Sequence, residues 1–329
     1  MPKMLPELQS APCIHRCALN PILSKENIPY SAELIFNAGV IKTPAGYRMV
    51  FRNDYGSFTN GTFRTNLGVA ESADGVHWTA HPEPMTHAEK VDDGEVKRIY
   101  DPRLMQIDGT VYICFAMDTV HGTRGGVGKI VGDFEGIDII SLSVPDNRNM
   151  VLFPEKINGM YVRLERPFPV YSRGRDRFDV WMSRSPDLKF WGESELLLGV
   201  EDVPFANDKI GPAAPPIKTD KGWLTLFHAV DLDKTRGKNG WESKWQKRYC
   251  AGIMLLDLEN PSKVLGICKT PLIAPEAVYE VEGFRTNVIF PGGMIAEPDG
   301  SVKIYYGASD TVECLAETTV QELLALCTR

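Results

Sequence analysis

One pattern recurs five times along the 329 residues: an apolar strand, a tight turn containing Gly, and a second apolar strand. The turns with their following strands are AGYRMVF (45–51), DGTVYICF (108–115), NGMYVRL (158–164), KGWLTLF (221–227) and DGSVKIYY (299–306). Glycine supplies the positive φ that such hairpin turns need. The turn glycines lie 50 to 78 residues apart, enough chain for four strands and their loops.

A second signature supports the repeat. The segments ESADGVHW (71–78) and SRSPDLKFW (183–191) share Ser-x-Asp-x-x-x-Trp, and weaker copies occur at 132–137 and 255–261. We interpret it as the hairpin between the third and fourth strands of a unit. Five four-stranded units predict an all-β, five-bladed β-propeller, with a tandem β-sandwich as the alternative.

The expected organisation is a single propeller domain over 1–329, with features at three places. About 20 residues at the N-terminus break the pattern and are read as an extension. The polar stretch at about 231–248 is read as an insertion, with the character of a mobile loop at the substrate or subunit edge. The helical periodicity of TTVQELLALC predicts a short C-terminal helix that closes or caps the assembly.

Composition excludes several classes of protein. The net charge of −7 argues against a general nucleic-acid binder. The chain has neither a signal-peptide pattern nor an apolar run of about 18 residues, so we expect no membrane segment and a cytoplasmic location. The seven cysteines are irregularly spaced, which is typical of free thiols in a reducing compartment, and we expect no metal site.

The first strand of each propeller blade lines the central channel, so the polar residues that head these strands should converge at one mouth. They are Asn37, Asp101, Arg148 with Asn149, Lys209, and Asn287. The second strands run back to the same face and should add a further ring. Its members are Arg52, Asp118, Arg166, His228 and Asp310. Recurrence at two equivalent places predicts that this face is the functional site.

The charges divide this face into two parts. Blades three and four contribute four potential cations, Arg148, Arg166, Lys209 and His228. Such groups repel one another unless an anion lies among them, and guanidinium groups bind phosphate in bidentate geometry. The alternative is that each cation pairs with a structural carboxylate, such as Glu155, Glu165 or Asp208. The other blades bring Asn37, Asp101, Asp118 and Asp310, which suit sugar hydroxyls.

Several segments together resemble glycoside hydrolase family 130, the mannoside phosphorylases and their relatives, which are five-bladed propellers. They are NPIL (20–23), FNAGV (36–40), IYDPR (99–103), DNRNMVLFPEKING (146–159), ERPFPVYSRG (165–174), KIGPAAPPIKT (209–219), GWLTLFHAV (222–230) and YYGASDT (305–311). The resemblance covers nearly the whole chain. It implies that Asp101 is the catalytic acid. The phosphate ligands that it implies are Arg148, Asn149, Arg166, Lys209, His228 and Tyr249, and the sugar ligands are Asn37, Arg64 and Asp310.

The family also contains hydrolases, which lack the cationic set that this sequence keeps. The resemblance therefore implies an inverting phosphorylase, a hexosyltransferase-type enzyme that cleaves a β-mannoside with inorganic phosphate to give α-mannose 1-phosphate. Phosphate is itself the nucleophile, so one carboxylic acid suffices and no cofactor is expected. An inverting β-mannoside hydrolase and a non-catalytic sugar-binding propeller are the alternatives. Family members often form homo-oligomers, which leaves an oligomer of this chain open.

Overall fold

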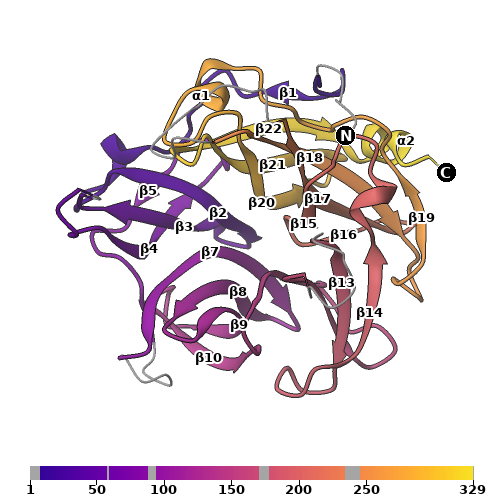
Figure 1. Ribbon diagram of the computed structural model, residues 1–329, viewed down its shortest axis with the longest axis horizontal. Helices are drawn as coiled ribbons and strands as arrows, with labels where there is room; N and C mark the ends of the chain where they lie inside the picture. Colours follow the sequence, from indigo (N-terminus) through magenta and orange to yellow (C-terminus); the bar gives the residue numbers. More distant parts are fainter. Residues whose placement is uncertain (1–7, 58, 88–93, 170–177, 234–244, 329) are drawn as a thin grey trace.

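The computed structural model shows five antiparallel β-sheets arranged around a central axis like the blades of a propeller (Figure 1). It describes residues 8–57, 59–87, 94–169, 178–233 and 245–328. The prediction of a five-bladed, all-β architecture is confirmed, and the tandem sandwich is excluded. Residues 234–244, the centre of the expected insertion, lie outside the described residues.

Each blade runs outward from the axis in chain order. Blade one consists of β2 (Leu34–Thr43), β3 (Gly46–Tyr55), β4 (Arg64–Ser72) and β5 (Thr79–Ala80). Blade two consists of β7 (Val96–Ile107), β8 (Thr110–Thr119), β9 (Gly122–Val131) and β10 (Gly136–Leu142), with β6 (Thr86–His87) parallel to β10. Blade three consists of β11 (Asn147–Leu152), β12 (Tyr161–Pro167), β13 (Val180–Ser185) and β14 (Gly192–Leu198).

The last two blades depart slightly from this plan. In blade four, β15 (Lys209–Pro212) and β16 (Ile217–Lys218) both pair with β17 (Trp223–Leu232), which β18 (Lys247–Leu256) and β19 (Val264–Ile267) follow. Blade five contains β20 (Ile289–Ala296), β21 (Ser301–Ala308) and β22 (Val312–Thr319). Its outer strand is β1 (His15–Arg16), from the other end of the chain.

The Gly turns that the repeat predicts join the first and second strands of the blades. In two of them, both central residues are left-handed: Asp108 and Gly109 have φ of 49° and 78°, and Asn158 and Gly159 have φ of 52° and 79°. This is the type I′ turn, whose twist matches that of the strands it connects. The Ser-x-Asp-x-x-x-Trp segments lie between β4 and β5 and between β13 and β14, as expected. There Asp74 Oδ1 accepts hydrogen bonds from the amides of Val76 and His77.

Three blades share a cross-strand pair of Phe and Gly that the sequence reading missed. Phe51 pairs with Gly68, Phe115 with Gly126, and Phe227 with Gly252. A methyl group on each glycine would meet the Phe ring at 2.1, 2.2 and 2.3 Å. Each ring therefore lies against the glycine of the third strand, at a position where a larger residue would clash with it.

Two residues of the segment read as an N-terminal extension, His15 and Arg16, complete the ring. His15 and Arg16 pair with Glu317 and Ala316, so the first and last strands of the chain meet in one sheet. Arg16 also binds Glu280, at 2.7 Å. Helix α2 (Val320–Leu326) confirms the expected C-terminal helix, and Thr319 caps it by accepting from the amide of Glu322.

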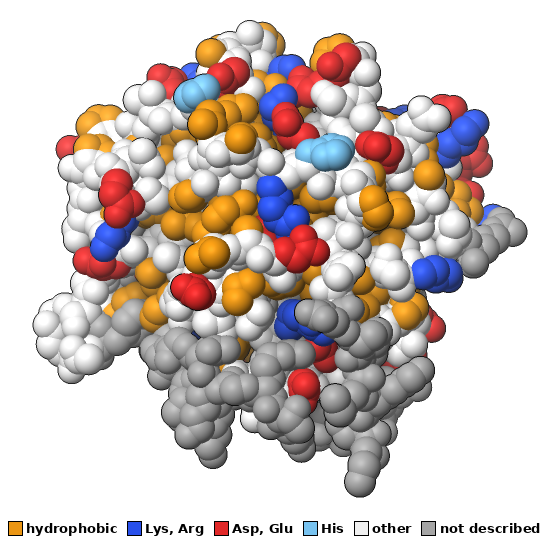
Figure 2. Space-filling view, turned by 90° about the horizontal axis from the view of Figure 1, so that it is seen from above, with side chains coloured by type: hydrophobic (Ala, Val, Ile, Leu, Met, Phe, Trp, Pro, Cys, Tyr) orange, Lys and Arg blue, Asp and Glu red, His pale blue; other side chains and the backbone are white. Residues whose placement is uncertain are grey.

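The core lies between the blades, and the largest cluster of buried side chains spans blades three to five. A four-residue helix, α1 (Val278–Val281), precedes blade five, and 3₁₀ turns occur at Lys25–Asn27 and Val200–Asp202. Figure 2 shows acidic and basic side chains interspersed on the side of the molecule that it presents. None of the helices among the described residues is long and apolar enough to cross a membrane.

Candidate active site at the propeller mouth

Four of the five blades place a left-handed Asn or Asp where the first strand meets the mouth. These residues are Asn37, Asp101, Asn149 and Asn287, with φ between 52° and 58°. Positive φ is uncommon outside glycine, and Asn and Asp tolerate it best. In β2, β7 and β11 a break in pairing register follows at once. Such bulges re-aim side chains and are frequent beside active sites, so the backbone itself turns these groups toward the axis.

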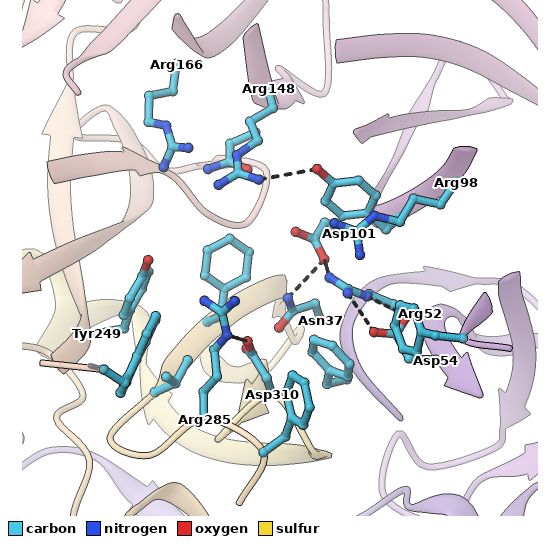
Figure 3. A pocket seen from close by; sticks show the side chains of 18 residues that line it. Asn37, Arg52, Asp54, Arg98, Asp101, Arg148, Arg166, Tyr249, Arg285 and Asp310 are labelled. Carbon is cyan, nitrogen blue, oxygen red and sulfur yellow. Dashed lines mark hydrogen bonds and ion pairs between the residues drawn. The ribbon is translucent and has the colours of Figure 1, made fainter. Parts of the chain in front are cut away.

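A cavity of about 300 Å³ opens at this mouth (Figure 3). Its lining includes seven of the ten residues that the family resemblance assigns to the site. They are Asn37, Asp101, Arg148, Asn149, Arg166, Tyr249 and Asp310. The other three of these ten do not line it: Lys209 and His228 are buried in blade four beside it, and Arg64 lies outside. The residues at the ends of the first and second strands therefore converge on one cavity, although the side chains at some of these positions do not reach it.

Asp101 is held by two donors on one side of its carboxylate. Asn37 Nδ2 donates to Oδ1 at 3.0 Å, and Arg52 Nη1 lies 3.4 Å from the same oxygen. Arg52 is itself fixed by Asp54, at 2.9 and 2.6 Å in bidentate geometry. Figure 3 shows the other oxygen of Asp101 pointing away from both donors. The carboxyl group is thus anchored by Oδ1, and Oδ2 is left to face a ligand.

Arg52, and not Arg64, is the arginine beside Asp101. Arg64 is exposed at the start of β4, and its Nη1 donates to the carbonyl oxygens of Gly61 and Phe63. Strand β3 carries Arg52 back to the mouth, where its guanidinium also lies 4.5 Å from the ring of Phe36. The expectation that Arg64 contacts the sugar therefore finds no support in its placement.

Asp118 also points elsewhere than expected. Its carboxylate accepts hydrogen bonds from Arg98, Tyr100 and Thr123, at 2.7 to 2.8 Å, and it does not line the cavity. Asp310, by contrast, does line the cavity and lies 3.5 Å from Arg285. Burial raises the pKa of Asp310 to about 6, against the opposing effect of Arg285 and Arg52.

Arg148, Arg166 and Lys209 form a cationic cluster on the other side of the cavity. Their side chains come from β11, β12 and β15, and Arg166 is only 2% exposed. Burial, followed by repulsion from Arg148, lowers the pKa of Arg166 to about 9. Burial and then Arg166 and Lys247 lower the pKa of Lys209 well below its usual value. The cluster is thus under electrostatic strain that a bound anion would relieve.

The carboxylates offered as alternative partners are engaged elsewhere. Glu155 binds Lys218 at 2.6 Å, Glu165 binds Arg163 at 3.0 Å, and Asp208 binds Lys247 at 3.0 Å. Within the described part of the chain, no carboxylate comes within 4.0 Å of a cluster cation. Structural ion pairing there does not account for the cluster.

His228 is not a fourth cation. It is fully buried, and burial together with Arg166 and Lys209 lowers its pKa well below the usual value. Its Nδ1 lies 3.2 Å from the carbonyl oxygen of Pro212, and its Nε2 lies 3.2 Å from Arg166 Nη1. Only a neutral ring with the proton on Nδ1 satisfies both contacts, because a guanidinium can only donate. His228 therefore supports Arg166 from behind.

An aromatic wall, which the sequence reading found only in part, joins the two sides. Tyr249 stacks between His228 and Trp245, with ring centroids 6.2 and 5.8 Å apart. Arg285 lies over Trp245 at 4.5 Å. Trp245 and Arg285 escaped the sequence reading because neither occupies a strand end of the repeat. Among the described residues, no three His, Cys, Asp or Glu side chains are grouped to hold a metal ion.

Comparison with known proteins agrees with this geometry. The family model for beta-1,4-mannooligosaccharide phosphorylase matches residues 14–329. The chain is 32% identical over 310 residues to a 1,2-beta-oligomannan phosphorylase of Thermoanaerobacter sp., covering 91% of this chain and 95% of the relative. It is also 32% identical over 327 residues to a beta-1,4-mannooligosaccharide phosphorylase of Ruminococcus albus, covering 94% of this chain and 90% of the relative.

Among solved structures, the beta-1,2-mannobiose phosphorylase of Listeria innocua, in complex with beta-1,2-mannobiose, superposes with a TM-score of 0.81. The sequence identity is 26%, and the match covers 95% of this chain and 99% of that one. A family match over nearly the whole length, with relatives above 30% identity, settles the membership. The chain belongs to glycoside hydrolase family 130.

Proposed function

We propose that the chain is an inverting phosphorylase, which cleaves β-mannosides with inorganic phosphate and releases α-mannose 1-phosphate. The observation that carries this proposal is the cationic cluster, in which Arg166 and Lys209 are buried and Arg148 is partly buried, beside the cavity that Asp101 also lines. The relatives act, by their names, on β-1,2- and β-1,4-linked mannosides, which supports the same substrate class.

In this mechanism Asp101 is the general acid. A phosphate oxygen attacks the anomeric carbon, the glycosidic C–O bond breaks, and the leaving oxygen takes the proton from Asp101, directly or through the mannose 3-hydroxyl. Because Asn37 and Arg52 both contact Oδ1, Oδ2 is the oxygen suited to carry that proton. Proton transfer by a positioned acid typically contributes about 10²–10⁴-fold in rate.

The cluster would place phosphate under the anomeric carbon and offset its charge. Arg148 and Arg166 are offered from adjacent strands, where they form a cross-strand pair. Cations held in a dry site act without reorganising during the reaction, which lowers the barrier by positioning and by electrostatics. A bound anion would also oppose the effect of burial and of the neighbouring cations, which lower the pKa of Lys209.

A hydrolase would need a second carboxylate to activate water. Among the described residues, the other carboxylates that line the cavity are Asp54 and Asp310, and arginines engage both of them. The phosphorylase is therefore the function that the site supports best. All seven cysteines are free, which fits a cytoplasmic enzyme supplied with inorganic phosphate.

The test is incubation of the protein with β-1,2-mannobiose, β-1,4-mannobiose and mannosylglucose, with and without phosphate, followed by NMR of the anomeric protons. A phosphorylase gives α-mannose 1-phosphate only when phosphate is present, and the preferred disaccharide identifies the linkage. Free mannose formed without phosphate would assign the hydrolase instead. Binding without any turnover would leave a carbohydrate-binding propeller.

A further inference from the structure

Tyr100 lies where the acid side of the cavity meets the phosphate side. It precedes Asp101 on β7 and is 1% exposed. The guanidinium groups of Arg52 and Arg98 lie 5.0 and 4.6 Å from its ring centroid. Cation–π contacts of this kind fix the plane of the ring. The ring is therefore a rigid base for its hydroxyl group.

The Tyr100 hydroxyl makes two hydrogen bonds of opposite sense. It donates to Asp118 Oδ1 at 2.8 Å and accepts from Arg148 Nη1 at 3.3 Å. Burial raises the pKa of Tyr100, so the phenol keeps its proton at neutral pH. Asp118 can only accept and a guanidinium can only donate, so the direction of both bonds is fixed.

Arg148 depends on this contact. In the described part of the chain its guanidinium hydrogen-bonds only to the Tyr100 hydroxyl, and its buried Nε lacks any partner. A long arginine side chain loses rotamer entropy when it is held in one geometry, and a contact must offset that loss. The two hydrogen bonds that link Asp118, the Tyr100 hydroxyl and Arg148 provide that constraint.

We infer that Tyr100 is a positioning residue, whose hydroxyl orients Arg148 for the phosphate co-substrate. The inference rests on the proposed phosphorolysis and deepens it, because it assigns the affinity for phosphate to a residue of the acid-bearing strand. Loss of the hydroxyl should weaken phosphate binding and leave mannoside binding unchanged.

The direct test is Tyr100→Phe, which keeps the ring and removes only the hydroxyl. A hydrogen bond to a charged group is worth enough to raise the KM for phosphate by about 10- to 100-fold. The KM for the mannoside and the Tm should stay near the wild-type values. Tyr112→Phe is the matched control, since Tyr112 lies on β8 of the same blade, packs against Tyr161 and does not line the cavity. Calorimetric titration with inorganic phosphate gives the affinity independently of turnover.

Two further variants separate positioning from general structure. Asp118→Ala removes the acceptor of the Tyr100 hydroxyl and should reproduce the phosphate defect. In an Arg148→Met background, Tyr100→Phe should add nothing to kcat/KM for phosphate, because the two residues act as one unit. The inference would be overturned if Tyr100→Phe and Arg148→Met had additive effects on kcat/KM for phosphate. It would also be overturned if Tyr100→Phe and Asp118→Ala both left the phosphate dependence unchanged. A third contrary result is an equal increase in the KM values for phosphate and for the mannoside together with a lowered Tm. Cleavage by the wild type without phosphate would instead refute the proposed function.

Discussion

The cationic cluster makes a prediction about stability as well as activity. Replacing Lys209 by Met keeps the length of the side chain and removes its charge from a site that is 8% exposed. Burial disfavours the charge on Lys209, and Arg166 and Lys247 repel it; unit charges about 4 Å apart interact by about 4 kcal/mol at an effective dielectric constant near 20. Asp208 offsets part of this repulsion in the wild type. We therefore expect Lys209→Met to stabilise the phosphate-free protein by about 1 to 3 kcal/mol, roughly 1 to 4 °C in Tm for a chain of this size.

The pH dependence has a definite sign. The pKa of Lys209 is lower in the folded protein than in the unfolded chain, so the unfolded state binds more protons between those two values. The stability of the wild type consequently rises with pH over that range, toward the ordinary lysine pKa of about 10.4. The advantage of Lys209→Met should therefore be largest near neutral pH and should shrink as the pH increases.

Phosphate should reverse the ranking of the two proteins. At 100 times its Kd, phosphate stabilises the wild type by about 2.7 kcal/mol, and the variant should respond less at the same concentration. The assay is differential scanning fluorimetry across a phosphate titration, with chloride at matched ionic strength. Lys263→Met is the control, because the Lys263 side chain is 61% exposed and the residue is distant in sequence from the cationic cluster. A phosphate-free variant less stable than the wild type, or equal phosphate shifts in both, would refute the reasoning.

Three other outcomes are expected. Asp101→Asn should abolish phosphorolysis while calorimetry still detects mannoside binding; substantial residual turnover would remove Asp101 from its role as the acid. Since the pKa of Asp310 is raised to about 6, mannoside affinity should fall as the pH drops through 6. Asp310→Asn should flatten that profile, and an unchanged slope in titrations from pH 5 to 8 would contradict the assignment. Gly126→Ala should lower the free energy of unfolding in urea by about 1 to 3 kcal/mol, because the added methyl group would meet the Phe115 ring. An unchanged free energy of unfolding would show that Phe115 can move aside.

The fold was predictable because its repeat is local. A turn such as Asp108–Gly109 is specified by adjacent residues, and the strand that follows it has a fixed direction, so the mouth residues could be placed by counting. The Phe–Gly pairs were not found because each joins two strands, and either residue alone is unremarkable. The segment HGTRGGVG shows the same difficulty. Its four glycines favour a loop by composition alone, yet Gly122–Val131 is strand β9, where side chains such as Phe115 lie against the glycines.

The site was only partly predictable because bulges change which way a side chain points. Simple alternation along β2 and β7 cannot show that Asn37 and Asp101 are left-handed and turned to the axis. It also cannot show that Asp118 faces Arg98 while Arg52 reaches the acid. The charge state of His228 depends on complete burial between two cations, which no spacing of residues reveals.

The pairing of β1 with β22 has a consequence for how the protein folds during synthesis. The paired residues His15 and Glu317 stand at opposite ends of the chain, so this contact has a sequence separation close to the maximum available. Loop-closure entropy makes such contacts slow to form. On the ribosome, blades one to four can assemble as their strands emerge. The ring can close only after blade five has been synthesised, because β1 pairs with β22 of that blade.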